Sequence, residues 1–220
     1  MSSVEIKICG ITRVDDALAA IELGAEMLGM NFYAESPRCI PLNQARSIAQ
    51  AVAGQVKPGR GKLVGVFVNM NIAELLRIAR AVPLAAVQLH GDESSKECEA
   101  IAGEFEVIRA LKVDAKFSAE HAVKFAACRG LLLDTPCVGH GGSGESFCWA
   151  NVNWQSVRDA LPAAKLFLAG GLHAGNVAEA IAVVHPDAVD VCSGVESAKG
   201  IKSLIEMGKF VAAVRAAERQ

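Results

Sequence analysis

A cysteine and an aspartate end two short apolar runs, where they could act as a base and an acid. Cys9 ends Ile6–Cys9, and Asp134 ends Leu131–Asp134. A thiolate can remove a proton, and the thiol pKa of about 8.5 falls in a cationic or hydrogen-bonding site. A carboxyl group whose pKa is raised by partial burial can protonate a leaving oxygen. Position alone also allows structural roles, with Cys9 as a buried thiol and Asp134 as a turn or helix-capping carboxylate.

Three more polar residues follow or interrupt apolar runs. Arg38 carries a fork of donors that can bind a carboxylate, although it could equally be a solvated loop charge. His90 could contact a substrate or make a structural hydrogen bond. Asp190 lies inside an apolar run and therefore needs a partner, so it either lines a site or pairs with a nearby cation.

Two glycine-containing pairs, Gly170-Gly171 and Ser193-Gly194, follow the last two apolar runs. Glycine lets backbone N–H groups approach a phosphate, and a helix start adds a favourable dipole. The simpler alternative is a pair of tight turns, but two such turns after neighbouring strands favour a phosphate site. A third glycine-rich stretch, residues 139–146, matches a Walker A loop except that Glu145 replaces the lysine. Glutamate would repel the phosphates, which argues against an NTPase.

Short apolar runs alternate with helical patterns along the whole chain. The candidate strands are Ile6–Cys9, Met27–Phe32, Leu63–Val68, Ala86–Leu89, Val107–Leu111, Leu131–Asp134, Leu166–Ala169 and Val189–Cys192. The candidate helices are Asp15–Leu23, Asn43–Val52, Ile72–Ala81, Ser94–Ala102, Ala119–Ala127, Asn153–Leu161, Val177–Val184 and Ser203–Ala217. Eight strand–helix units favour an α/β (β/α)8 TIM barrel over an open doubly wound sheet. We expect a single domain over residues 1–220, with the site at the carboxyl ends of the strands.

The composition limits the possible partners. Of 220 residues, 52% are hydrophobic and 5% aromatic, which is enough for a core of small aliphatic side chains. The 22 basic and 24 acidic residues argue against a nucleic-acid partner. No apolar run approaches the ~18 residues of a membrane span, and no export signal is visible at the start. Seven scattered cysteines without a C-x-x-C pair suggest neither zinc nor disulfides, but a reducing cytoplasm. We expect the six thiols other than Cys9 to serve only as packing.

Taken together, the motifs resemble the phosphoribosylanthranilate isomerases of tryptophan biosynthesis. The resemblance runs in order from Lys7 to about Phe210. Its pieces are residues 7–12 (KICGIT), 36–38 (SPR), 87–91 (VQLHG), 133–135 (LDT), 142–144 (GSG), 169–172 (AGGL) with Asn176-Val177, 193–196 (SGVE) and 200–202 (GIK). Each piece alone is a weak signal, but their order at barrel-loop positions is specific.

The resemblance implies an Amadori rearrangement of N-(5'-phosphoribosyl)anthranilate to 1-(2-carboxyphenylamino)-1-deoxyribulose 5-phosphate, the third step from chorismate in tryptophan biosynthesis. It implies no cofactor and no metal. Carried over residue by residue, it makes Cys9 the general base, Asp134 the general acid and Arg38 the group that binds the substrate carboxylate. The phosphate-binding positions are Gly170, Gly171, Ser193 and Gly194, and further candidate substrate contacts are His90, Asp190 and Gly142. We expect a phosphosugar substrate, a cytoplasmic location and a monomer or homodimer.

Three positions depart from the family pattern. Glu145 replaces a lysine, Cys192 stands where serine is common, and Ser203 stands where an acidic residue often follows Lys202. These changes spare Cys9, Asp134 and Arg38. Two other functions compete with this one. The Amadori isomerase of histidine biosynthesis pairs two aspartates, so Cys9 argues against it. A silent phosphate-binding barrel would not need Cys9 and Asp134.

Overall fold

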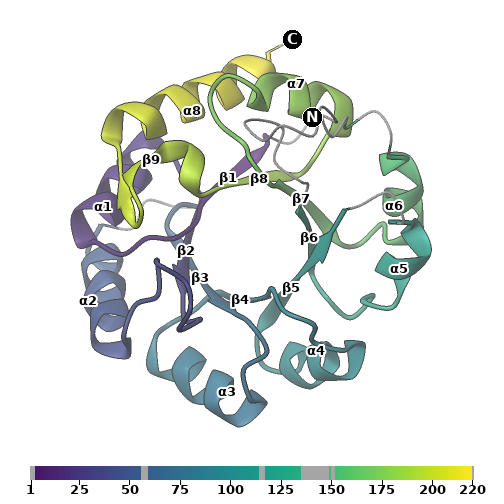
Figure 1. Ribbon diagram of the computed structural model, residues 1–220, viewed down its shortest axis with the longest axis horizontal. Helices are drawn as coiled ribbons and strands as arrows, with labels where there is room; N and C mark the ends of the chain where they lie inside the picture. Colours follow the sequence, from purple (N-terminus) through teal and green to yellow (C-terminus); the bar gives the residue numbers. More distant parts are fainter. Residues whose placement is uncertain (1–2, 56–58, 114–116, 135–148, 150–151, 220) are drawn as a thin grey trace.

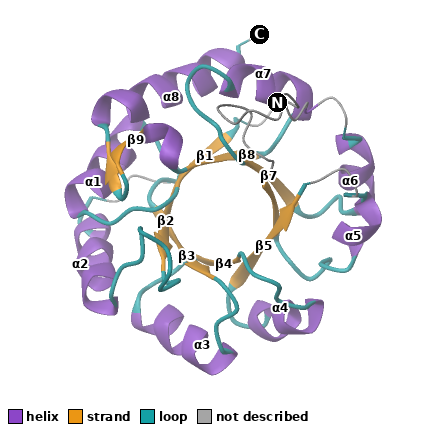
Figure 2. Ribbon diagram, in the orientation of Figure 1, coloured by secondary structure: helices purple, strands orange, loops and turns teal. Residues whose placement is uncertain are grey.

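Eight parallel strands form a closed barrel, and the helices surround it (Figures 1 and 2). The computed structural model describes residues 3–55, 59–113, 117–134, 149 and 152–219. The strands are β1 (Glu5–Ile8), β2 (Met27–Asn31), β3 (Lys62–Phe67), β4 (Ala86–Leu89), β5 (Glu106–Lys112), β6 (Gly130–Asp134), β7 (Lys165–Ala169) and β8 (Ala188–Val191). Each pairs with its neighbours in sequence, and β1 closes the ring against β8. The (β/α)8 barrel is thus confirmed, and the open doubly wound sheet is excluded.

Helices follow the strands and form the outer layer. They are α1 (Val14–Leu23), α2 (Leu42–Ala53), α3 (Ile72–Ala81), α4 (Ser95–Ala102), α5 (Ala119–Val123), α6 (Trp154–Ala160), α7 (Val177–Val184) and α8 (Leu204–Ala217). α8 packs against both α7 and α1, which closes this layer around the barrel. None of the helices in the described part of the chain is long and apolar enough to cross a membrane.

One predicted helix is too long. The structure ends α5 at Val123, four residues before the predicted end at Ala127. Beyond Val123 the backbone N–H groups of Phe125, Ala126 and Cys128 bond three residues back, which is the pattern of tight turns. The Cζ atom of the buried Arg109 lies over the Phe125 ring, 5.1 Å from the ring centroid. These turns therefore accompany a tertiary contact. Helical propensity alone does not record such a contact.

Alternation along the strands divides the barrel interior into layers. A buried apolar cluster of small and branched residues fills its middle: Met27, Val64, Ala86, Ile108, Ala110, Leu132, Phe167, Ala169 and Ala188. Successive side chains on a strand point to opposite faces, so residues two positions further along share this inward face. That alternation directs Gln88, Asp134 and Asp190 inward at the carboxyl ends of β4, β6 and β8. The barrel thus gathers polar side chains at one end.

A two-stranded hairpin follows β8 and was not expected from the sequence. A short 3-10 turn, η2 (Ser193–Val195), leads into β9 (Glu196–Ala198), which pairs with β10 (Ile201–Lys202) before α8 begins. Two or three residues per strand are too few for a periodic pattern to reveal. The hairpin matters because it carries Glu196 and Lys202 to the end of the barrel where β8 finishes.

Candidate active site

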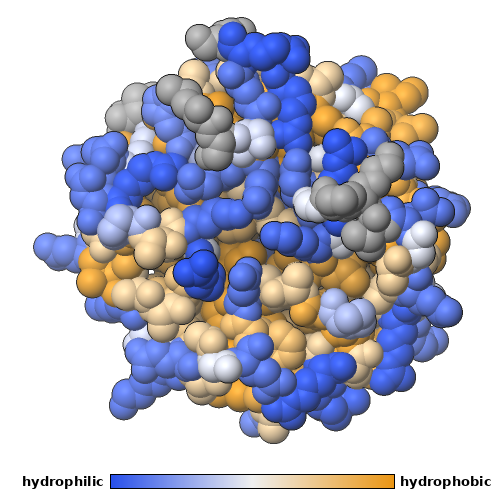
Figure 3. Space-filling view, turned by 180° about the vertical axis from the view of Figure 1, so that it is seen from behind, coloured by the Kyte–Doolittle hydropathy of each residue, from blue (hydrophilic) through white to orange (hydrophobic). Residues whose placement is uncertain are grey.

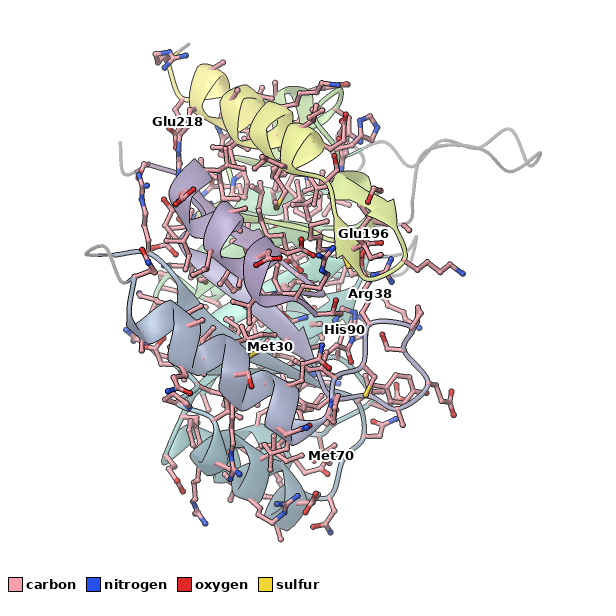
Figure 4. The ribbon with its side chains drawn as sticks, turned by 90° about the vertical axis from the view of Figure 1, so that its left-hand side faces the viewer. Met30, Arg38, Met70, His90, Glu196 and Glu218 are labelled. Atoms are coloured by element: carbon pink, nitrogen blue, oxygen red, sulfur yellow. The ribbon has the colours of Figure 1, made fainter. Side chains whose placement is uncertain are left out.

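A cavity of about 330 Å³ opens at the carboxyl ends of the strands. It brings together most of the residues that the sequence singled out: Cys9, Arg38, His90, Asp134, Gly170, Gly171, Asp190 and Ser193. Gln88 and Cys192 also line it. Arg38, His90 and Glu196 lie toward the same end of the molecule, and Glu218 lies at the other (Figure 4). Gly142 falls outside the described residues.

The opposite end of the barrel has a second cavity, of about 200 Å³, with different chemistry. Its charged lining residues include Glu5, Lys62, Glu106 and Lys165. Lys165 Nζ pairs with Glu5 Oε2 at 2.7 Å. On this face hydrophilic residues surround a central region where hydrophobic residues are visible (Figure 3). None of the predicted site residues that the structure describes lies here. In such barrels the amino-terminal end contributes to stability, whereas the carboxyl end holds the active site.

Cys9 is fixed between β8 and β2 just after β1 ends. Its backbone N–H donates to the Val191 carbonyl over 2.8 Å, which continues the β1–β8 ladder by one residue. On the other side, Gly29 leaves room for the thiol. A Cβ at Gly29 would lie 2.8 Å from Cys9 Sγ and 3.2 Å from Lys7 Nζ. The same small residue therefore accommodates both the thiol and the lysine beside it.

Lys7 and Asp190 form a buried ion pair beside Cys9. Lys7 Nζ donates to Asp190 Oδ1 over 2.9 Å, and the side chains are 0% and 8% exposed. Burial lowers the pKa of Lys7, but the negative charges of Asp190 and Cys9 outweigh it and raise that pKa above its ordinary value. Burial raises the pKa of Asp190 to about 6, against the opposing effect of Lys7. The pairing resolves the alternatives for Asp190, which both lines the cavity and meets a cation.

Cys9 and Cys192 are hydrogen-bonded, and the charges around them decide which one is ionised. The hydrogen bond from Cys192 lowers the pKa of Cys9 well below its ordinary value, burial opposes this, and Lys7 and Lys202 add to the lowering. The same hydrogen bond raises the pKa of Cys192. Because Lys7 hydrogen-bonds to Cys9, we assign the thiolate to Cys9 and the thiol to Cys192. The surroundings of Cys9 thus favour its thiolate, the form that can accept a proton.

Asp134 forms the end of a short polar chain with His90 and Gln88. His90 Nε2 lies 3.3 Å from Asp134 Oδ2, and His90 Nδ1 lies 2.9 Å from the Gln88 side-chain amide. About one third of the Asp134 side chain is exposed, and Asp134 lines the cavity. Asp134 therefore faces the cavity with a second titratable group, His90, as its neighbour.

Arg38 is held by a carboxylate from the hairpin. Its Nε and Nη2 donate to the two oxygens of Glu196 over 2.7 and 2.6 Å, and Lys202 Nζ reaches Glu196 Oε1 at 3.1 Å. The hydrogen bonds from Arg38 to Glu196 raise the pKa of Arg38. Burial raises the pKa of Glu196, but Arg38 and Lys202 outweigh it and lower that pKa. Two cations share one anion, and the Nη1 donors of Arg38 are not used by Glu196. The cluster can therefore still bind a ligand carboxylate.

The two predicted phosphate loops lie against each other. Gly170 and Gly171 have φ angles of 94° and 60°, which glycine adopts without strain. A Cβ on Gly194 would lie 2.0 Å from the Leu172 carbonyl oxygen, so the backbone after β8 touches the backbone after β7. Gly170, Gly171 and Ser193 line the cavity, whereas Gly194 packs behind it. Three of the four positions therefore face a ligand, and the fourth holds the loops together.

The sequence interpretation missed four contributors: Lys7, Gln88, Glu196 and Lys202. All four lie in the quoted motifs, but without a role. Lys7, Gln88 and Lys202 are buried polar residues, and Lys7 and Gln88 interrupt apolar strands. That interruption was the available signal, because a buried charge needs a partner. The view of the other thiols as packing was also wrong for two residues, since Cys39 is exposed and Cys192 contacts Cys9. Among the described residues, no three His, Cys, Asp or Glu side chains converge as metal ligands.

Comparison with known proteins identifies the relatives of this barrel. The family model for N-(5'-phosphoribosyl)anthranilate isomerase matches residues 6–213. The isomerase of that name from Pseudomonas putida strain W619 is 47% identical over 219 residues, covering 99% of this chain and 100% of the relative. The one from Ralstonia nicotianae is 41% identical, covering 97% and 93%.

Solved structures of the same enzyme superpose closely. The crystal structure from Thermotoga maritima is 39% identical, with a TM-score of 0.84, and the match covers 97% of this chain and 99% of that chain. A crystal structure of the enzyme in complex with reduced 1-(o-carboxyphenylamino)-1-deoxyribulose 5-phosphate is 38% identical, with a TM-score of 0.83 and the same coverage. A further structure, with a TM-score of 0.82, 37% identity and the same coverage, is of monomers generated from the dimeric Thermotoga maritima enzyme.

Proposed function

The chain belongs to the N-(5'-phosphoribosyl)anthranilate isomerase family, and from that premise we propose that it converts N-(5'-phosphoribosyl)anthranilate to 1-(2-carboxyphenylamino)-1-deoxyribulose 5-phosphate. This is an Amadori rearrangement, and we place it in the cytoplasm as the third step from chorismate in tryptophan biosynthesis. We propose Asp134 as the general acid and Cys9 as the general base. The reaction needs two proton transfers at neighbouring atoms of one substrate and, in this proposal, no cofactor or metal.

The acid step opens the sugar. Asp134, protonated, gives its proton to the ring oxygen while the bond between that oxygen and C1 breaks, and the nitrogen lone pair forms a Schiff base at C1. Two observations support this role. The Asp134 carboxyl group lines the cavity, and His90 Nε2 lies 3.3 Å away, where it can return a proton to Asp134 after the step.

The base step moves a hydrogen from C2. The Cys9 thiolate removes the C2 proton, the electron pair of that C–H bond forms the enolamine, and tautomerisation gives the ketone. The lowering of the Cys9 pKa by Cys192, Lys7 and Lys202 supports this role because it favours the thiolate, the form that accepts a proton. Lys7, buried beside the thiolate and fixed by Asp190, stabilises the charge before the proton arrives. Lys7 is therefore a positioning residue for the base.

The two ends of the substrate have separate binding groups in this proposal. Arg38 holds the anthranilate carboxylate through the donors that Glu196 leaves free. The phosphate binds against Gly170, Gly171 and Ser193, which follow β7 and β8, whereas Arg38 lies in the loop after β2. Binding both ends fixes C1 and C2 between Asp134 and Cys9, and such positioning accounts for a large part of the rate enhancement in reactions of bound substrates.

The observation that carries the proposal is the presence of the Cys9 thiol group and the Asp134 carboxyl group in one cavity. The test is an assay with freshly prepared N-(5'-phosphoribosyl)anthranilate that follows the loss of its fluorescence. Turnover should fall by about 10²-fold or more in Cys9→Ala and in Asp134→Asn. Cys98→Ala is the matched control, because Cys98 lies on the buried face of α4 and does not line the cavity.

Two outcomes would contradict the proposal at different levels. Near-wild-type turnover in Cys9→Ala or Asp134→Asn would remove the acid and base assignment while leaving the isomerase activity. No wild-type activity above the uncatalysed rate would favour the silent phosphate-binding barrel. The monomer-or-homodimer expectation stays a prediction, which sedimentation of the purified chain can test.

A further inference from the structure

Cys9 and Cys192 are the first residues after β1 and β8, which are neighbouring strands. The β1–β8 register pairs Lys7 with Asp190 and Ile8 with Val191, and Cys9 and Cys192 come next. Neighbouring strands lie about 4.7–4.9 Å apart, within the range of about 4.4–6.8 Å that Cα atoms span across a disulfide. The two thiols already share a hydrogen bond, and both are free. Bond formation therefore needs little backbone movement.

The surroundings activate this pair toward an oxidant. Lys202 Nζ lies 3.8 Å from Cys192 Sγ, and Lys7 hydrogen-bonds to Cys9 from the other side. Cations near a cysteine favour the thiolate, which is the form that peroxides attack. Both cysteines line the 330 Å³ cavity, which is large enough for small molecules to enter. Reactivity and access therefore meet at the same two residues.

We propose that hydrogen peroxide oxidises Cys9 and that Cys192 resolves the product into a Cys9–Cys192 disulfide, which makes this pair a reversible modification site. The Cys9 thiolate attacks one peroxide oxygen, the O–O bond breaks, and the hydroxide that leaves takes a proton to become water. Cys9 is now a sulfenic acid. The Cys192 sulfur then attacks the Cys9 sulfur, its proton leaves with the hydroxyl group as a second water, and the S–S bond forms. Two electrons pass from the two thiols to the peroxide.

The disulfide blocks the proposed base and also protects it. A sulfenic acid without a nearby thiol proceeds to sulfinic acid, which thiol reagents do not reduce, whereas a disulfide returns to two thiols. The effect on activity rests on the proposed function, in which Cys9 is the base. The chemistry of the cross-link does not, because the bond can be measured by mass.

The protein contains an internal comparison in Cys98 and Cys128. These two thiols also share a hydrogen bond, but they are 0% and 3% exposed and do not line the cavity. Because thiol–thiol contact is common to both pairs and Arg109 acts as a cation near Cys98 and Cys128, the difference in oxidation between the pairs reports mainly on access from the cavity.

The experiment treats the reduced full-length protein with a small excess of hydrogen peroxide, stops the reaction with catalase and a thiol-alkylating reagent, and measures mass. We expect the loss of two hydrogen atoms. Trypsin digestion without reductant should join peptide 8–13, which contains only Cys9, to peptide 166–199, which contains only Cys192. Peptides 97–109 and 125–129, which carry Cys98 and Cys128, should remain alkylated. Isomerase turnover should fall in proportion to the cross-linked fraction and return with dithiothreitol.

The variant Cys192→Ser separates this pair from general oxidation, with each protein compared with its own untreated activity. In Cys192→Ser we expect oxygen atoms added at Cys9 and a loss of turnover that dithiothreitol does not restore. Cys39→Ser, which removes an exposed thiol, should still cross-link as the wild type does. A wild-type disulfide to Cys39, Cys137 or Cys148, oxidation of Cys98 and Cys128 to the same extent, or full recovery of oxidised Cys192→Ser would overturn the proposal. A cross-link in a protein without isomerase activity would instead contradict the proposed function alone.

Discussion

Lys7 Nζ lies 2.9 Å from Asp190 Oδ1 inside the barrel, and this pair places a fixed positive charge beside Cys9. The arrangement links the first and last strands, because Lys7 and Asp190 are register partners across β1 and β8. Closing the barrel therefore creates the ion pair, and its lysine adds to the lowering of the pKa of the cysteine two residues after Lys7. Barrel closure and thiolate chemistry depend on the same contact.

Replacing Lys7 should move the pH dependence of turnover. In Lys7→Met the cation is lost, so the pKa of Cys9 should rise toward the ordinary thiol value of about 8.5. Activity needs the thiolate, so the rising limb of kcat/KM against pH should shift to higher pH. The ultraviolet absorbance of the thiolate gives the same pKa without substrate. Lys165→Met is the control, since this inward-facing lysine lies in the opposite cavity. An unchanged pH profile in Lys7→Met would show that Lys7 does not tune Cys9.

Asp190 should make the stability of the fold depend on pH in a specific window. Burial raises its pKa from 3.8 to about 6 in the folded protein, so the folded state holds this proton more tightly than the unfolded state. The stabilisation that this proton contributes is fully present below pH 3.8, the unfolded-state pKa. It is lost as the pH rises through about 6, the folded-state pKa. Relative to Asp190→Asn, the wild-type free energy of unfolding should fall across this window, by at most about 1.4 kcal/mol per pH unit. Urea unfolding of both proteins measures it, and a constant difference would contradict it.

The sequence predicted the barrel and the position of its site because both follow from local patterns. The alternation of short apolar runs with helical segments can be recognised directly in the sequence. So can a polar residue at the end of an apolar run, such as Asp134. The resemblance favoured the proposed roles of Cys9 and Arg38 over the structural alternatives that their positions alone allowed. The side chains that pair with these site residues could not be predicted from the sequence. Arg38 and Glu196 are separated by 158 residues, and the β9–β10 hairpin that joins them is too short to show a period.

Glu196 should act on substrate binding through Arg38. In Glu196→Gln the bidentate contact loses its charge, so the guanidinium is no longer held in place, and hydrogen bonds to charged groups contribute about 1.5–3 kcal/mol. We expect KM to rise about tenfold or more with a smaller change in kcat. Glu104→Gln is a matched control, because Glu104 makes the same two-point contact with Arg80 on the exterior, at 2.7 and 2.6 Å. Equal KM values for wild type and Glu196→Gln would remove this positioning role.

Gly194 should hold the phosphate loops together, and a single methyl group tests this. In Gly194→Ala the new Cβ would lie 2.0 Å from the Leu172 carbonyl oxygen, which is backbone, so the loops after β7 and β8 must separate. Phosphate binding by Gly171 and Ser193 should weaken, which raises KM for the substrate and weakens competitive inhibition by inorganic phosphate. Gly103→Ala is the control, since its Cβ would meet nothing within 4 Å and its φ is −67°. That variant should keep its KM and gain about 0.4–1 kcal/mol of stability. If Gly194→Ala binds phosphate as the wild type does, the contact between the loops does not shape the site.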